Sequence, residues 1–533
     1  MPNFIDAATL KAWLHEGHEI ALLDVREAGQ FADAHLFYAI PLPYSRLEID
    51  VERLVPCHST PIALCDNGAD GVSSRAAKRL TALGYRDVRI LEGGIRAWKD
   101  EGYELFAGVN VPSKAFGELI EHAWHTPRVS ARELQAMKER REDFVIVDGR
   151  PFAEYRKMNI PGGICCPNGE LALRIGEIAP NPATKIVVNC AGRTRSIIGA
   201  ETLRAFGIRN PIVALENGTQ GWFLEDLEME TGATRKYPGA PTAGALASLR
   251  AKAQEVAHHF DIPVVSSTQV DTWLAHDSRT TFLFDVRTEE EFKAGTLAGA
   301  AHAPGGQLVQ ATDQWVGVKG ARIVLADGEM VRAFMIAMWL RQMGHDAQVL
   351  EGGVDARLAF KGRTTTPLPP ALESAGIDQI EGARLLDLRP SMAYRAGHAV
   401  GARWSTRSRV VNDAAAATRV VIIADDPLIA RLAAVDLHDA GIRDVRSCAA
   451  KLPMVSTPTD PPDSDCIDFV FFTAGRHEGN REASLQYLRW EMNLLNQLDD
   501  DEREGFNISS LPGNEKRETG NANLLDPSSS PKS

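Results

Sequence analysis

The segment IVDGRPFAEY, residues 146–155, is an apolar stretch that ends in an aspartate, one further residue and an arginine. The same pattern occurs three more times, as LLDVREAGQF (22–31), LFDVRTEEEF (283–292) and LLDLRPSMAY (385–394). Each copy is followed by a turn, a second apolar strand, an Ala/Leu-rich helical stretch and a third strand. Repetition of a whole set of motifs indicates tandem structural domains rather than one large core.

The alternation of short apolar strands with helical stretches predicts an α/β fold in which a parallel sheet carries helices on both faces. Three residue pairs at matching points of the first two copies are separated by the same 124 positions: Asp24 and Asp148, Asp66 and Cys190, and Glu92 and Glu216. The first two copies are therefore in register. We expect four tandem domains of this kind, which we call repeats 1 to 4, followed by a C-terminal helical extension.

The predicted boundaries follow from where these patterns begin and end. They place repeat 1 at 1–107, repeat 2 at 125–237, repeat 3 at 258–362, repeat 4 at 371–455, a strand-helix extension at 463–498 and a disordered tail at 499–533. The linker between repeats 2 and 3 contains a Pro/Gly-rich stretch, 238–244, that is typical of a flexible hinge. We therefore expect two pairs, repeat 1 with repeat 2 and repeat 3 with repeat 4.

The extension carries its own pattern. The segment DFVFF, residues 468–472, predicts a strand. A helix is expected after it, with an apolar stripe formed by Leu485, Leu488, Met492 and Leu495. From Asp499 onward the chain is acidic and then rich in Ser, Pro and Asn, which is typical of disorder.

The composition argues against several kinds of protein. With 533 residues and a net charge of −13, the chain lacks the basic surface that nucleic acids and anionic membranes require. No stretch approaches the roughly 20 apolar residues of a membrane span, and no signal-peptide pattern is present, so we expect a cytoplasmic protein. The seven cysteines are spaced too irregularly for a disulfide framework or a zinc site.

The ordered motifs of the repeats are the Asp-x-Arg strand, the IPG turn, the strand that leads into a loop and helix, and the EGG segment. Together they resemble the rhodanese homology domain, and the resemblance covers roughly residues 1–455. It implies a sulfurtransferase fold in which a loop cysteine carries sulfur as a persulfide. The whole chain is similar to bacterial proteins with four rhodanese modules, in which not every module needs to be active.

The stretch VVNCAGRTRS, residues 187–196, holds the residues that this chemistry would use. Cys190 follows an apolar strand, and in an open parallel sheet the ligand crevice lies beyond the carboxyl ends of the strands. The loop is expected to become a helix near Ile197, so that its N–H groups converge on the sulfur. We expect Cys190 to be the nucleophile and the substrate to contact Ala191, Gly192, Arg193, Thr194, Arg195 and Ser196.

The two arginines decide the chemistry expected of this loop. Positive charge lowers the pKa of a nearby thiol, which predicts a thiolate nucleophile at neutral pH. A cationic loop also suits a sulfonate, which favours thiosulfate over 3-mercaptopyruvate, because relatives that use the latter typically have a neutral loop. The alternatives are a buried core thiol for Cys190, solvated charges for Arg193 and Arg195, and a helix cap for Ser196.

The other cysteines and repeats are expected to play different parts. At the position of Cys190 the other repeats carry Asp66, Asp327 and Asp425, which cannot form a persulfide, so we expect those repeats to be inactive. Cys65 is predicted to lie in the core, since strand alternation points it to the opposite face. The Asp-x-Arg pair recurs in repeats without a thiol and is therefore interpreted as structural. Cys165 and Cys166 are either buried structural thiols, a sulfur relay, or partners in a protective disulfide.

Alternative functions remain at this point. A phosphatase related to rhodanese would have five residues between its cysteine and arginine, whereas four separate Cys190 from Arg195. A non-catalytic sulfur-sensing scaffold and a mercaptopyruvate sulfurtransferase are the other candidates. We expect no metal and no organic cofactor, a small-molecule sulfur donor and a thiol acceptor as partners, and leave a homodimer open. The pocket is expected between repeats 1 and 2, so that residues 1–237 would suffice for activity.

Overall fold

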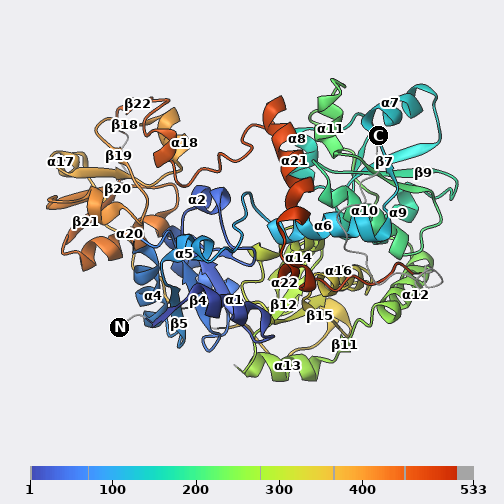
Figure 1. Ribbon diagram of the computed structural model, residues 1–533, viewed down its shortest axis with the longest axis horizontal. Coiled ribbons are helices and arrows are strands. Elements are labelled where there is room, and N and C mark those ends of the chain that lie inside the picture. Colours follow the sequence, from blue (N-terminus) through green and yellow to red (C-terminus); the bar gives the residue numbers. More distant parts are fainter. Residues whose placement is uncertain (1–2, 70, 277, 364–365, 449–451, 513–533) are drawn as a thin grey trace. The chain divides into compact units, whose positions relative to one another are not determined.

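The computed structural model describes residues 3–512, except residues 70, 277, 364–365 and 449–451. Within these residues it contains four sheets of five strands each and one two-stranded sheet (Figure 1). The chain divides into two compact units. Unit 1 consists of Met1–Val109 and Thr364–Phe472, and unit 2 consists of Asn110–Arg363 and Thr473–Ser533.

Repeats 1 and 4 lie in unit 1, whereas repeats 2 and 3 lie in unit 2. The predicted pairing of repeat 1 with repeat 2, and of repeat 3 with repeat 4, is therefore wrong. Only the end of the predicted hinge is helical: α12 (Ala243–His259) begins at a cap formed by the Thr242 side chain and packs against α16 (Arg332–Gln342) of repeat 3. The Arg174 guanidinium of repeat 2 donates to the carbonyl oxygen of Gly239, at 2.7 Å, which fixes the start of the linker.

The sheet of repeat 2 has the parallel strand order β6-β10-β9-β7-β8. Its strands are β6 (Arg128–Val129), β7 (Phe144–Asp148), β8 (Ile164–Cys165), β9 (Lys185–Asn189) and β10 (Ile212–Leu215). The other three sheets repeat this order, as β1-β5-β4-β2-β3, β11-β15-β14-β12-β13 and β16-β21-β20-β17-β19. The prediction of four similar parallel sheets is confirmed.

The remaining strands have the following bounds. In unit 1 they are β1 (Asn3–Ile5), β2 (Ala21–Asp24), β3 (Ile40–Pro41), β4 (Ile62–Cys65), β5 (Val88–Leu91), β16 (Ser374–Ala375), β17 (Arg384–Asp387), β19 (Arg403–Trp404), β20 (Arg419–Ile423) and β21 (Asp444–Cys448). In unit 2 they are β11 (Val264–Val265), β12 (Thr281–Asp285), β13 (Ala301–His302), β14 (Arg322–Ala326) and β15 (Asp346–Leu350). The short antiparallel sheet pairs β18 (His398–Ala399) with β22 (Met454–Val455).

Helices cover both faces of each sheet, and in repeat 2 the alternation along β9 shows why. Val188 packs on one face in a cluster with residues of α9 (Leu171–Ile178) and α10 (Thr194–Ala205). Val187 points to the opposite face and packs with residues of α7 (Ala131–Glu139) and α11 (Gly218–Leu224). A strand that is apolar on both faces is buried between two layers of helices.

The other helices have these bounds. Unit 2 also contains α6 (Val111–Trp124), α8 (Phe152–Lys157), η2 (Asn168–Glu170), α13 (Ser267–Ala275), α14 (Glu289–Ala294), α15 (Gly305–Gln310), η3 (Thr312–Gln314), η4 (Gly353–Asp355), α21 (Arg481–Gln497) and α22 (Asp500–Glu504). Unit 1 contains α1 (Ala7–His15), α2 (Ala28–Asp33), η1 (Tyr44–Arg46), α3 (Leu47–Leu54), α4 (Val72–Ala82), α5 (Gly94–Asp100), α17 (Ile377–Ile380), α18 (Ser391–Ala396), α19 (Val410–Asp413), α20 (Pro427–Asp439) and η5 (Asp463–Asp465).

In every repeat the aspartate and the arginine of the Asp-x-Arg motif form an ion pair with each other, and the aspartate is buried. In repeat 2, Asp148 ends β7 and accepts two hydrogen bonds from the Arg150 side chain, at 2.9 and 2.7 Å. Arg150 also donates to the carbonyl oxygen of Met158, at 2.7 Å, and so ties the strand end to the end of α8. The equivalent pairs are Asp24–Arg26, Asp285–Arg287 and Asp387–Arg389. The structural interpretation of this motif is confirmed.

The predicted strand at 468–472 is wrong, because this segment forms turns and irregular chain. The chain just before this segment is held by repeat 1 instead of by a sheet. The carbonyl oxygen of Ile467 accepts the N–H groups of Gly29 and Gln30 at the start of α2, at 2.9 and 3.2 Å. The predicted helix exists as α21. Its predicted stripe is only partly right, since Leu488 is buried but Leu485 and Met492 are exposed. The buried face of α21 consists of Ala483, Ser484, Tyr487, Leu488, Glu491 and Leu494.

Part of the predicted disordered tail is ordered. Residues 500–504 form α22, and the chain after it packs on unit 2: the Asn507 N–H donates to the carbonyl oxygen of Gln342, at 2.8 Å, and the Phe506 ring stacks on Phe116. The rest of the predicted tail, 513–533, lies outside the described residues. None of the described helices combines the length and apolar character of a membrane span.

Candidate active site

Cys190 lies directly beyond the carboxyl end of β9, as the sequence pattern predicts. The loop after it is shorter than expected, because α10 begins at Thr194 instead of near Ile197. The carbonyl oxygen of Arg193 opens the helix by accepting the N–H groups of Ser196 and Ile197, at 3.0 and 3.2 Å. Arg195 and Ser196 therefore belong to the first turn of the helix.

The thiol of Cys190 is enclosed, since only 1% of the residue is exposed. Its Sγ lies 3.5 Å from the Ser196 hydroxyl and 3.7 Å from the carbonyl oxygen of Arg193. The Ser196 hydroxyl donates in turn to the carbonyl oxygen of Arg193, at 2.8 Å. Ser196 thus contacts the sulfur and also closes the first turn. The carbonyl oxygen of Ala191 accepts the N–H of Gln220, at 3.0 Å, which anchors the loop to α11.

The two loop arginines are not free to face a substrate. Arg193 forms a buried, bidentate ion pair with Glu118 of α6, at 2.7 and 2.8 Å, and a second ion pair with Glu121. Arg195 forms a bidentate pair with Glu154 of α8, with both distances 2.9 Å. Such paired geometry is strong and directional. The carboxylates compensate much of the positive charge that the sequence places around the thiol.

Burial of the thiol overturns the expected pKa of Cys190. Burial raises the pKa of the thiol above its ordinary value, although the charge of Arg195 and the hydrogen bond with Ser196 act in the opposite direction. The nearby Glu491 carboxylate raises it further. The sequence shows the arginines but not the acidic partners that distant helices bring to them, and desolvation disfavours a charged thiolate. The prediction of a lowered pKa is wrong for this closed arrangement.

Helix α21 supplies two site residues that the sequence pattern did not single out (Figure 1). Glu491 is 1% exposed, and its Oε1 accepts the Thr194 hydroxyl at 2.5 Å and the Thr194 N–H at 3.3 Å. Its Oε2 is buried and has no hydrogen-bond partner among the described residues. A Cβ added at Gly192 would lie 3.0 Å from the Tyr487 ring and 3.1 Å from Glu491 Oε2. Gly192 therefore allows α21 to pack directly on the loop.

Helix α6 contributes a cation beside the same loop. Lys114 Nζ donates to the hydroxyl of Tyr487, at 3.1 Å, and lies 5.4 Å from the centre of that ring. Burial lowers the pKa of Lys114, while the charge of Glu491 acts to raise it. The same helix also carries Glu118 and Glu121, and nothing in its sequence says which loop Lys114 faces.

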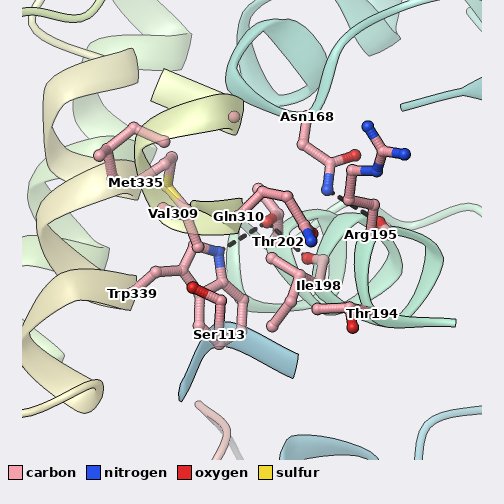
Figure 2. A pocket seen from close by; sticks show the side chains of 12 residues that line it. Ser113, Asn168, Thr194, Arg195, Ile198, Thr202, Val309, Gln310, Met335 and Trp339 are labelled. Atoms are coloured by element: carbon pink, nitrogen blue, oxygen red, sulfur yellow. Dashed lines mark hydrogen bonds between the residues drawn. The ribbon is translucent and has the colours of Figure 1, made fainter. Parts of the chain in front are cut away.

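Repeat 3 forms a wall next to the site. Figure 2 shows a narrow pocket between α10 of repeat 2 and α15 and α16 of repeat 3, with the Arg195 guanidinium turned away from it. The Trp339 indole N–H of α16 donates across this boundary to the Thr202 hydroxyl, at 2.8 Å. The buried Arg332 of repeat 3 reaches Glu170 of repeat 2, at 2.8 Å. The neighbours of the site therefore belong to repeat 3 and α6, whereas the sequence predicts a pocket between repeats 1 and 2.

The strand registers identify the matching position in the other repeats. Asp148 pairs with Asn189, just as Asp24 pairs with Cys65 and Asp285 with Ala326. The residue that follows is Cys190 in repeat 2, Asp66 in repeat 1 and Asp327 in repeat 3. In repeat 4, Asp387 pairs with Ile423, so the matching residue is Ala424 and the assignment of Asp425 is wrong by one position. Repeats 1, 3 and 4 hold no thiol at this position.

The aspartates of repeats 1 and 3 fill their own loops. Asp66 accepts the N–H groups of Gly68 and Ser73, at 2.7 and 2.8 Å. Asp327 accepts those of Met330, Val331 and Arg332, at 3.0, 3.0 and 2.9 Å. Converging N–H groups of this kind bind anions. In repeat 2 the Ser196 N–H acts on the Cys190 sulfur in this way and lowers its pKa, although burial outweighs this effect.

Cys65, Cys165 and Cys166 contact core side chains or the backbone. Cys65 is fully buried in the core of repeat 1, as predicted. Cys165 donates to the carbonyl oxygen of Arg150, at 3.5 Å, and Cys166 lies in the core below α9. Within the part of the chain that the structure describes, no disulfide joins any of the seven cysteines. The disulfide alternative is not realised in this structure, and the relay role of Cys165 or Cys166 stays a prediction.

Comparisons with known proteins agree with this architecture. The model of the rhodanese-like domain matches residues 6–101, 130–225 and 267–359. A crystal structure of a thiosulfate sulfurtransferase from Pseudomonas aeruginosa is 39% identical in sequence, with a TM-score of 0.86, and the match covers 95% of this chain and 99% of that one. A sulfurtransferase from Allochromatium vinosum is 30% identical over 107 residues, which are 20% of this chain and 97% of that protein. With three matched domains and a relative similar along nearly its whole length, the chain belongs to the rhodanese-like family.

Proposed function

We propose that this protein is a thiosulfate sulfurtransferase that carries sulfur as a persulfide on Cys190. The observation that carries the proposal is the position of Cys190: it is the thiol at the carboxyl edge of the sheet where α10 begins, while the other repeats have Asp or Ala there. The relatives support sulfur transfer in general. The name of the Pseudomonas aeruginosa protein supports thiosulfate as the donor.

The proposed reaction has two steps. The Cys190 thiolate attacks the outer sulfur of thiosulfate, the sulfur–sulfur bond of the donor breaks, and sulfite leaves with the bonding electron pair. The terminal persulfide sulfur is then attacked by an acceptor thiolate, or by cyanide in vitro, and the Cys190 thiolate is regenerated. No metal or organic cofactor takes part in this scheme. We assign stabilisation of the negative charge to the first N–H groups of α10 and to the positive charge of Arg195, which acts on the Cys190 sulfur although its guanidinium is paired with Glu154.

Entry of the donor requires a change in the contacts of α21. The Thr194 N–H and hydroxyl, which would bind a sulfonate oxygen, are taken by Glu491 Oε1. Cys190 is also enclosed beneath the contact between Tyr487 and Gly192. We therefore propose that the donor anion replaces the Glu491 carboxylate at the start of α10, and that α21 moves when it does so.

The overall proposal is tested by an assay of the full chain with thiosulfate and cyanide. Formation of thiocyanate and sulfite in equal amounts is the expected result. Turnover with 3-mercaptopyruvate but not with thiosulfate would assign another donor. Absence of turnover with either donor would favour the non-catalytic scaffold.

Replacing Arg195 with alanine tests the donor specificity. Loss of a charge-assisted hydrogen bond costs about 1.5–3 kcal/mol, so we expect kcat/KM for thiosulfate to fall roughly 10- to 100-fold. The decrease with 3-mercaptopyruvate should be smaller, because that donor carries no sulfonate. Arg140→Ala, at a half-exposed arginine of the same repeat, serves as the control. Equal losses with both donors would contradict the proposed role of Arg195.

Replacing Glu491 with alanine tests the closure by α21. Removing a buried acceptor worth about 1–2 kcal/mol should raise the population of open molecules about 5- to 30-fold. The rate of Cys190 alkylation by iodoacetamide, followed by mass spectrometry of the peptide that contains it, is expected to rise by that factor. Glu482→Ala, at an exposed position of the same helix, should leave the rate unchanged. An unaltered rate in Glu491→Ala would show that α21 does not limit access.

A further inference from the structure

A cavity of about 580 Å³ lies in unit 1 at the carboxyl edge of the sheet of repeat 1. Its walls come from residues 25–27 after β2, from Ala69, Val72 and Arg75 near the start of α4, and from Ser408, Arg409, Val411 and Asn412 of repeat 4. Small-molecule sites typically measure about 300–1,000 Å³ and lie between domains, at the edge where parallel strands end. The cavity occupies the place in repeat 1 that the Cys190 site occupies in repeat 2.

Sulfur chemistry is excluded as the purpose of this cavity. Asp66 stands at the position of the thiol and its carboxylate already accepts two loop N–H groups. None of the residues that line the cavity is a cysteine. Cys65, the neighbouring thiol, is buried in the core and points to the carbonyl oxygen of Leu23, 3.8 Å away. A ligand here would be bound without being chemically changed.

Two arginines, one from each repeat, line the cavity and are held in place. The Arg75 guanidinium donates to the carbonyl oxygen of Ser408, at 2.9 Å, and lies 5.2 Å from the centre of the Tyr44 ring. The Arg409 guanidinium donates to the carbonyl oxygen of Asp465, at 3.0 Å, and lies 5.8 Å from the centre of the Trp404 ring. Among the described residues, no carboxylate forms an ion pair with either arginine. Each guanidinium has five N–H donors, so donors remain for a ligand.

The other charged residues of the lining leave this positive charge in excess. Arg26 is compensated by its ion pair with Asp24. Glu27 is buried and accepts the Ser45 hydroxyl, and burial raises its pKa to about 7, so it is only partly ionised at neutral pH. Apolar side chains complete the walls: Val25, Val72, Val411 and Ile467. The lining therefore combines two cationic groups with an apolar surface.

We propose that unit 1 binds a small organic anion in this cavity, with its carboxylate or sulfonate group on Arg75 and Arg409 and its apolar part against the valines. Because one arginine belongs to repeat 1 and the other to repeat 4, the ligand would hold the two repeats together. This gives the inactive repeats a binding function that is separate from Cys190.

The experiment is calorimetric titration of the full chain with hexanesulfonate and with hexanoate, which distinguishes the two anionic groups. Hexan-1-ol serves as the uncharged probe and inorganic sulfate as the probe without an apolar part. We expect one molecule of at least one organic anion per chain, and much weaker binding of hexan-1-ol and sulfate. Equal binding of the alcohol, or no binding of either organic anion, would overturn the proposal.

Variants assign the binding to this cavity. Arg75→Gln and Arg409→Gln are each expected to weaken anion binding about tenfold or more. Arg86→Gln, at an exposed arginine of repeat 1 outside the cavity, and Cys190→Ser, in unit 2, should leave it unchanged. Val411→Trp keeps both arginines and fills the cavity, so it should abolish binding even if the arginine variants fold poorly. Unchanged affinity in Val411→Trp and in folded arginine variants would rule this site out.

Discussion

A protein in which Cys190 is replaced by serine is expected to gain no mass on treatment with thiosulfate, whereas the native chain gains one sulfur atom, about 32 Da. The reason is chemical: a serine hydroxyl cannot form the sulfur–sulfur bond that a thiolate forms. Thiocyanate formation should fall at least about a thousandfold, as it does when a covalent nucleophile is removed. Intact-protein mass spectrometry after removal of excess thiosulfate measures the mass gain directly.

The matched control is Cys165→Ser, another buried thiol of the same repeat. It should keep the gain of one sulfur atom, because its Sγ contacts the backbone of Arg150 and is not required for the first step. A loss of turnover in this variant with an intact mass gain would reveal a relay after Cys190. A persulfide on the Cys190→Ser protein would place the chemistry on another cysteine.

Replacing Arg332 with alanine is expected to destabilise the protein by about 3–5 kcal/mol, the usual cost of removing one partner from a buried ion pair. The Arg332 side chain is 0% exposed and lies within ion-pair distance of Glu170, Glu291 and Glu329, at 2.8, 2.7 and 2.5 Å. Its loss leaves these carboxylates together with no central cation. Because Glu170 belongs to repeat 2 and the arginine to repeat 3, the destabilisation should extend to the repeat that carries Cys190.

Denaturant unfolding measured by circular dichroism gives the free energy of unfolding of the native chain and of Arg332→Ala, and the difference between the two is the predicted quantity. The control is Lys293→Ala, which breaks an exposed pair with Glu289 in α14 and should change the stability by less than about 1 kcal/mol. Stability of Arg332→Ala within that same range would show that the contact between repeats 2 and 3 contributes little.

The sequence by itself determines the features of this protein that depend on residues close together in the chain. An unbroken run of β-branched residues specifies β9, because a strand buried on both faces needs apolar side chains on both. The Asp-x-Arg motif specifies its own ion pair over two residues, and the position of Cys190 follows from where its strand ends. These features repeat along the chain, and so the fold class and the candidate nucleophile can be read from pattern alone.

The tertiary structure decided how the repeats pair and how the site is closed. Glu491 meets Thr194 across 297 positions of sequence, and Arg193 meets Glu118 across 75. No periodicity encodes such contacts, and the leucines and methionine of α21 do not define its buried face, because polar Tyr487 and Glu491 are buried there beside Leu488. Glu118 and Glu154 pair the arginines of the loop, while burial raises the pKa of Cys190. The sequence therefore places charge next to the thiol, but only long-range packing determines whether that charge is available to it.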